Sequence, residues 1–384
     1  MTAGRALLGL LALPLAVAAA PFVPKDDAEI VQRLPYRADA AERARRTALA
    51  RDPAQLPLAV ASARAALQRA QCHGDPRELG VAQAALAPWW PRVDAPAEAV
   101  LLRARVRQAR HEFEAAQADL RRLLARPDLA PTERAQALLD AAALHRLRAE
   151  LPQARALCGQ LQPLAALPAA ACLAELDSLS GQGPAAAQAL AALSPGRVTP
   201  PWLALMRAEL ADRLGDEAAA PTLYRLALAG EDGVYTRAAL ADWLLARQRA
   251  AEALALVERS PDAEADALLL RRVIALRQLR RDAAAPTAQL RERLAAAERR
   301  EPGRHAREQA RFALDVAGDA REALRLARLN WAQQREPADA LLLLRAALAA
   351  GRDGDAARQE LAATLRALGW QDQRLAALDR SFAP

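Results

Sequence analysis

Small residues recur along this chain of 384 residues at a nearly constant interval, and this period limits the folds that the chain can adopt. Eight alanines are separated by 38, 32, 34, 33, 32, 38 and 33 residues, namely Ala116, Ala154, Ala186, Ala220, Ala253, Ala285, Ala323 and Ala356. A second set stands twelve residues before the first five of them, namely Ala104, Ala142, Ala174, Ala208 and Ala241. Such a period predicts stacked repeats, each of which buries its apolar face against its neighbours.

Each repeat is expected to be a pair of helices. Alanine and leucine are abundant, aromatic residues make up only 3% of the chain, and apolar residues recur at helical spacing between prolines and glycines. The pattern predicts helices over residues 55–72, 77–87, 95–109, 114–125, 133–147, 202–214, 217–229, 235–246 and 251–258. Connections this short allow only neighbouring helices to pack, so the expected fold is all-α and built from antiparallel pairs.

One stretch resembles a tetratricopeptide repeat (TPR). It carries Ala208, a glycine at the turn (Gly215), Ala220, and an aromatic residue in the second helix (Tyr224). The tryptophan, leucine and tyrosine of the first-helix consensus are replaced here, by Ala204, Arg207 and Ala211. The period of about 34 residues is also that of the family. The resemblance implies a right-handed superhelical solenoid whose first helices line a concave binding surface.

The chain is also similar to exported bacterial TPR proteins of unassigned function. The similarity lies in GDPRELG at 74–80, AQAAL at 82–86 and PWW at 88–90, and again in NW at 330–331 and QREPADA at 334–340. This resemblance spans most of the chain after its first residues. It implies no enzymatic activity.

The ends of the chain differ from the repeats. Residues 1–19 have a short basic start, an apolar run from Ala6 to Val17 and small residues before the expected cleavage point, which predicts a signal peptide. We expect export to the bacterial periplasm after cleavage; an uncleaved membrane anchor is the alternative. Residues 20–57 are expected to form a leader and a capping helix over 39–50, residues 58–369 the repeats, and residues 370–384 a C-terminal capping helix.

Three cysteines would then enter an oxidising compartment. Cys158 lies near the end of one predicted helix and Cys172 early in the next, so the two can form a disulfide, which would leave Cys72 as a free thiol. The alternative is that all three are small core residues.

The net charge of +7 does not by itself indicate a polyanionic partner. Almost all basic residues are arginine, Lys25 is the only lysine, and they alternate with acidic residues instead of forming a stripe. We therefore expect no nucleic-acid partner. Membrane-surface association through the arginine excess is a less favoured alternative.

No motif indicates catalysis, a metal or a cofactor. The four histidines lie far apart in the sequence, and GQGP at 181–184 lacks the strand and the free amide that a dinucleotide fingerprint requires. We therefore expect a non-enzymatic scaffold or adaptor that binds a protein or peptide. The alternative is an envelope enzyme or transport accessory whose active site the sequence does not reveal.

The repeat period also predicts which residues line the concave face. They are Arg105, Arg146, Glu175, Trp202, Glu209, Asp212, Tyr235 and Asp242, with Arg345 in a later repeat. The middle of this face is expected to be acidic and aromatic, which would suit a positively charged peptide. Trp202 and Tyr235 have a second interpretation, ordinary packing between repeats, and it is the one that the sequence favours.

Overall fold

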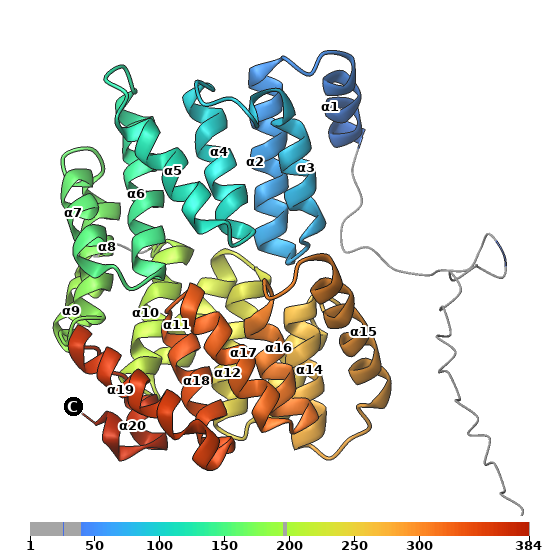
Figure 1. Cartoon of the computed structure of the whole chain (residues 1–384), viewed down its shortest axis with the longest axis vertical. Coiled ribbons are helices and arrows are strands. Elements are labelled where there is room, and N and C mark those ends of the chain that lie inside the picture. The colour runs from blue at the N-terminus through green and yellow to red at the C-terminus, as the bar shows by residue number, and fades with distance from the viewer. Residues whose placement is uncertain (1–25, 27–39, 195–197, 384) are drawn as a thin grey trace, which may run out of the picture. The chain divides into compact units, whose positions relative to one another are not determined.

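The computed structural model describes residues 26, 40–194 and 198–383, and every regular element within them is helical (Figure 1). The chain divides into two units, residues 1–34 and 35–384, and the described helices belong to the second. The expected signal peptide and most of the leader lie outside the described residues. None of the described helices is both long enough and apolar enough to span a bilayer.

Eighteen of the twenty α-helices form nine consecutive pairs. The pairs are α2 (Leu56–His73) with α3 (Arg77–Ala85), α4 (Ala97–Ala109) with α5 (Phe113–Leu124), α6 (Pro131–Leu147) with α7 (Leu151–Leu161), α8 (Ala166–Ser178) with α9 (Gly183–Ala192), α10 (Pro201–Arg213) with α11 (Ala219–Gly230), α12 (Val234–Ala246) with α13 (Ala250–Glu258), α14 (Asp266–Gln278) with α15 (Ala284–Arg300), α16 (Ala306–Phe312) with α17 (Ala320–Gln333), and α18 (Pro337–Ala349) with α19 (Asp355–Leu368). A π-helical turn, Ala313–Ala317, extends α16. The helices predicted from the sequence agree with these bounds to within about two residues.

A short helix stands at each end of the pairs. At the N-terminal end, α1 (Ala40–Arg51) packs on α2, and its buried Glu42 accepts hydrogen bonds from Arg45, Arg46 and Arg69. At the C-terminal end, α20 (Gln373–Leu378) packs on α18 and α10 through the buried Leu375. Both helices lie where the sequence predicts caps.

The turn inside every pair contains one residue with positive φ. These residues are Gly74, His111, Ala149, Gly181, Gly215, Gln248, Arg280, Gly318 and Gly351. In six of the turns the next residue donates its N–H to the carbonyl five residues earlier, as Asp216 does to Ala211 at 2.9 Å. This bond satisfies a carbonyl at the helix end, and the left-handed residue reverses the chain.

The left-handed residues repeat at the intervals of the alanines. From His111 onward they are separated by 38, 32, 34, 33, 32, 38 and 33 residues, because each alanine of the first set lies five residues after one of them. Six of those eight alanines are buried, as are all five of the second set. The backbone therefore has the period that the sequence predicts.

Two alanines of the first set, Ala285 and Ala356, are exposed. In the last pair a 3-10 turn, Gly351–Gly354, precedes α19, and the buried small residue is Ala357. In α15 the first buried residue is Leu290. The periodic alanine is therefore not always the buried residue of its helix.

First helices of successive pairs also contact one another. Each first helix touches the next one in two series: α2 with α4, α4 with α6, α6 with α8 and α8 with α10, and then α12 with α14, α14 with α16 and α16 with α18. Later pairs also meet earlier ones: α12 contacts α2, and the N–H of Arg335 donates to the carbonyl of Leu147 at 2.7 Å. First helices of late pairs, or the residues next to them, therefore contact first helices that lie almost 200 residues earlier in the sequence.

A disulfide joins Cys158 of α7 to Cys172 of α8, with their Cα atoms 6.0 Å apart. Cys158 is fully buried, whereas Cys72 is partly exposed and not bridged. The bridge spans a separation of 14 residues and links one pair to the next.

The four non-glycine left-handed residues lead to a stability prediction. Gln248 is exposed, so Gln248→Gly should remove backbone strain without removing packing and raise the free energy of unfolding by about 1 kcal/mol. Gly318→Ala is the matched opposite, because nothing lies near the added Cβ, and it should lower stability by about the same amount. Urea unfolding followed by circular dichroism measures both, and equal stabilities would contradict the role of the left-handed turn.

The disulfide gives a second prediction. Replacing Cys158 and Cys172 together by alanine should lower the free energy of unfolding by about 3 kcal/mol, because the unfolded chain loses a constraint. Dithiothreitol should destabilise the unsubstituted protein similarly and leave the double variant unchanged. No effect of the reductant would show that the two cysteines act only as core residues.

Candidate functional site at the inner cluster

Six charged or phenolic side chains from different helices converge on one region, which we call the inner cluster. Its members are Arg146 of α6, Glu175 of α8, Glu209 of α10, Tyr235 of α12, Arg307 of α16, and Glu336 at the N-cap of α18. The sequence analysis placed the first four on the concave face. The structure brings these four together and adds the last two.

Arg146 links two distant parts of the chain. Its Nε lies 3.4 Å from Glu175 Oε1, and its Nη2 lies 3.4 Å from Glu336 Oε1. The Glu175 and Glu336 carboxylates raise the pKa of Arg146 above its usual value, although burial opposes them. The guanidinium therefore stays charged and ties α6 to α8 and α18.

Arg307 holds the other side of the cluster. It binds both oxygens of Asp339, at 2.6 and 2.7 Å, and Glu336 Oε2 at 2.7 Å. Asn330 donates to the same Asp339 at 2.6 Å. Burial alone would disfavour a charged Glu336, but Arg307 and Arg146 outweigh it and lower its pKa. Asn330, Glu336 and Asp339 come from the C-terminal segments that resemble exported TPR proteins, and here they form a structural network.

Glu209 differs from the other predicted inner carboxylates. Glu175, Asp212 and Asp242 each have an arginine within ion-pair distance, whereas Glu209 accepts only a hydrogen bond from Tyr235 Oη, at 2.7 Å. Burial raises the pKa of Glu209, and the negative charges of Glu336 and Glu175 raise it further, against the opposing effects of the hydrogen bond from Tyr235 and the charge of Arg146. The charge of Glu209 in turn raises the pKa of the Tyr235 phenol.

Asp242 lies in a second ion-paired group next to the cluster. It contacts Arg271 Nη2 at 2.6 Å and Arg311 Nη1 at 2.7 Å. Burial opposes ionisation, but the two guanidinium groups lower the pKa of Asp242 well below its usual value. The expectation of an acidic middle of the concave face is therefore wrong for Asp242, because arginines of α14 and α16 neutralise it.

Two other predicted residues lie outside the cluster. Asp212 is buried between Arg247, at 3.2 Å, and Arg374 of α20, at 2.8 Å, so it forms an internal ion pair and is not on an open surface. Arg105 pairs with Asp140 at 2.8 Å and connects α4 to α6.

Trp202 and Tyr235 are open to solvent, with 42% and 56% of their surfaces exposed. Each is the second residue of its first helix, one repeat apart. The side chains next to them in sequence are buried instead. These are Leu203 and Ala204 beside Trp202, and Val234 and Thr236 beside Tyr235. Neither aromatic residue is therefore buried between repeats, although Tyr235 contacts the preceding repeat through its hydrogen bond to Glu209.

The sequence reasoning missed Arg307, Glu336 and Asp339. Their register within the later repeats could have indicated an inward position. Their proximity to Arg146 could not be predicted from nearby sequence, because it depends on the tertiary packing of α16 and α18 near α6.

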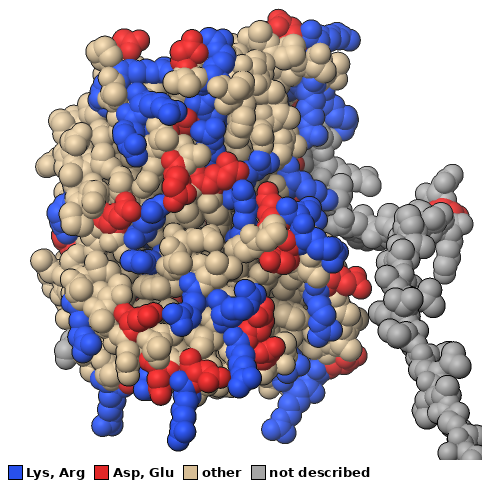
Figure 2. All heavy atoms as spheres, in the orientation of Figure 1, with Lys and Arg blue, Asp and Glu red and all other residues tan. Residues whose placement is uncertain are grey.

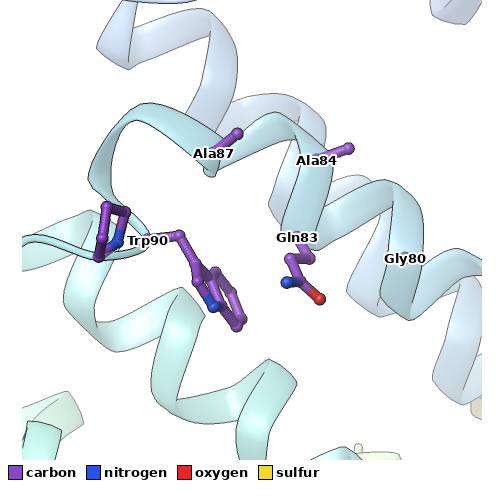
Figure 3. Close-up of a pocket in the computed structure, with 6 residues that line it drawn as sticks. Gly80, Gln83, Ala84, Ala87 and Trp90 are labelled. Carbon is purple, nitrogen blue, oxygen red and sulfur yellow. The ribbon is translucent and has the colours of Figure 1, made fainter.

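A surface pocket of about 450 Å³ lies elsewhere, around the PWW segment. Its lining residues are Gly80, Gln83, Ala84, Ala87, Trp90 and Pro91, and the indole of Trp90 and the amide of Gln83 both point into it (Figure 3). Arg107 lies over the Trp90 ring at 5.4 Å. The lining contains no ionisable side chain, so it offers no acid, base or nucleophile.

The described residues contain no group of three or more histidine, cysteine, aspartate or glutamate side chains that could hold a metal ion. Basic and acidic side chains are interspersed over the face drawn in Figure 2, as the sequence pattern predicts for solvated helices.

The pKa of Glu209 leads to a prediction with a defined sign. Because its pKa is raised in the folded chain, the stability that its protonation provides is complete below the pKa of an unfolded glutamate, about 4.3, and is lost as the pH rises through the folded pKa. Glu209→Gln should therefore stabilise the protein at pH 7, by roughly 1 kcal/mol. The difference should disappear near pH 3, as thermal unfolding at the two pH values can show.

Glu336→Gln is the matched control, because the pKa of Glu336 is lowered instead. It removes a carboxylate that pairs with two arginines and should destabilise the protein at pH 7, by about 1 to 2 kcal/mol. Equal effects of the two substitutions would contradict the distinction between Glu209 and its neighbours.

In comparisons with known proteins, no family model matches this chain and no curated protein matches it. The assignment of a function therefore depends on the geometry of the described residues.

Proposed function

We propose that this protein is a non-enzymatic scaffold or adaptor of the bacterial cell envelope, which binds a protein partner on the concave face of a TPR-like solenoid. The repeat period, the left-handed turn of each pair and the layer of contacting first helices support this architecture. The contacts of α12 with α2 and of Arg335 with Leu147 support a superhelix that brings late repeats to early ones.

The exposure of Trp202 and Tyr235 is the observation that carries the proposal. Large aromatic side chains that remain open to solvent at equivalent positions of adjacent repeats offer much apolar area to a partner at a low cost in conformational entropy. Such residues dominate the energetics of protein interfaces.

The ion pairing of the other inner residues supports a role in binding and not in catalysis. Arg146, Arg307, Glu336 and Asp339 hold one another in ion pairs, and Asp242 is held by two arginines. Groups fixed in this way stabilise the arrangement of the helices and are poor candidates for proton transfer. The inner surface would then act as a rigid support for the exposed aromatic residues.

The disulfide supports the proposed location in the periplasm. A bridge between Cys158 and Cys172 would persist in the periplasm and would be reduced in the cytosol. The proposed location also depends on the signal peptide expected at residues 1–19, which are outside the described part of the chain.

Site-specific photo-crosslinking in the cell tests the proposal. A benzophenone amino acid at Tyr235 should capture a discrete envelope protein, identified by mass spectrometry, and the same residue at Arg225, exposed on α11, should not. Trp202→Ala should weaken binding of the captured partner by about tenfold or more, whereas Leu226→Ala, an exposed apolar residue of α11, should leave it unchanged. The same background captured from both positions would contradict the proposal.

A further inference from the structure

Carboxylates outnumber guanidinium groups at the inner cluster. Together with Asp339, the cluster has four carboxylates, those of Glu175, Glu209, Glu336 and Asp339, and the guanidinium groups of Arg146 and Arg307; the charges of Glu175 and Glu209 also act on the nearby Arg213. Glu336 and Asp339 both bind Arg307, and Glu175 binds Arg146, whereas Glu209 has only the hydroxyl of Tyr235. Glu209 is therefore the one of these four carboxylates that pairs with no described arginine, although the charge of Arg146 also acts on it from a greater distance.

Two exposed aromatic side chains accompany this carboxylate. Tyr235 donates its hydroxyl to Glu209, so its ring lies beside the carboxylate, and more than half of the residue remains exposed. Trp202 lies seven residues before Glu209 in α10, which places both on one face of that helix two turns apart. A carboxylate beside an exposed aromatic ring is a recognition element for a cationic group.

The same chain fills such an arrangement with its own arginines at two other places. Arg247 lies over the Trp243 ring at 4.2 Å and pairs with Glu217, and Arg107 lies over the Trp90 ring while it binds Asp119 at 2.6 Å. A guanidinium that stacks on an indole and pairs with a carboxylate is thus a stable arrangement in this fold. At Trp202, Tyr235 and Glu209 the aromatic rings and the carboxylate are present, and no described arginine pairs with Glu209.

We propose that the partner places a lysine or arginine side chain against Glu209 and the exposed ring of Tyr235, on the face of α10 that also carries Trp202. This inference rests on the proposed function, because it specifies the chemistry of the partner at the same inner surface. The added cation would form an ion pair with Glu209 and a cation–π contact with an exposed ring. It would also offset part of the repulsion that Glu336 and Glu175 exert on Glu209.

The test uses the full chain with 5-fluorotryptophan and pools of acetylated, amidated hexapeptides. The pools share randomised neutral flanking residues and differ at one fixed position, which is arginine, lysine, citrulline or norleucine. Binding is measured by ¹⁹F NMR, with the Trp202 resonance assigned by Trp202→Phe, and by fluorescence anisotropy of labelled pools. We expect the arginine or lysine pool to shift the Trp202 resonance and to bind at least tenfold more tightly than the citrulline and norleucine pools.

Two variants test whether the Glu209 carboxylate binds the cationic group. Glu209→Gln should reduce the affinity for the cationic pool by at least tenfold, while Glu292→Gln, which neutralises an exposed glutamate of α15, should bind as the unsubstituted protein does. Because Glu209→Gln is expected to stabilise the fold, lost binding cannot be attributed to unfolding. Equal affinity of Glu209→Gln for the cationic pool would overturn the inference.

The remaining outcomes separate the inference from the proposed function. Neutral pools that shift the Trp202 resonance and bind as tightly as the cationic ones would overturn the cationic partner and leave the inner surface as a binding site. Absence of binding by every pool would overturn the inference, and with no crosslinked partner from Tyr235 it would overturn the proposed function as well.

Discussion

The left-handed residue in the turn of each helix pair is the constraint on which the other features depend. It ends the first helix, reverses the chain within a few residues and sets where the second helix begins. Four of the nine turns accept this backbone conformation without glycine, at His111, Ala149, Gln248 and Arg280. Each such residue costs about 1 kcal/mol relative to glycine, so the packing of the helices must determine the turn more strongly than the turn residue does.

The helices and their period could be predicted because both depend on local information. Apolar spacing and the positions of proline and glycine locate helix ends, and the alanines that let helices approach closely recur with the repeat. Ala285 and Ala356 show the limit of this reasoning. In a chain so rich in alanine, a periodic alanine is not always the buried one, and in the last pair and in α15 the buried positions are Ala357 and Leu290 instead.

The inner residues could be predicted only in part, for a physical reason. The repeat register places a side chain on one face of its own helix, which was sufficient for Arg146, Glu175, Glu209 and Tyr235. It does not specify what approaches that face from another repeat. Arg374 of α20 buries Asp212, and Arg311 of α16 neutralises Asp242. The charge environment of an inner side chain therefore depends on contacts with residues distant in sequence. It cannot be predicted from the sequence of its own helix alone.

Glu209 departs from the charge compensation of its surroundings, and shortage of basic residues does not explain it. The chain has 53 lysine and arginine residues against 46 aspartate and glutamate residues, and it supplies an arginine to each of the other predicted inner carboxylates. A glutamine could accept the same hydrogen bond from Tyr235 without the cost of a desolvated charge. Local departures from otherwise consistent structure tend to mark functional positions. The proposed cationic partner would give this charge a role, because binding would supply the ion pair that Glu209 does not form with any described arginine.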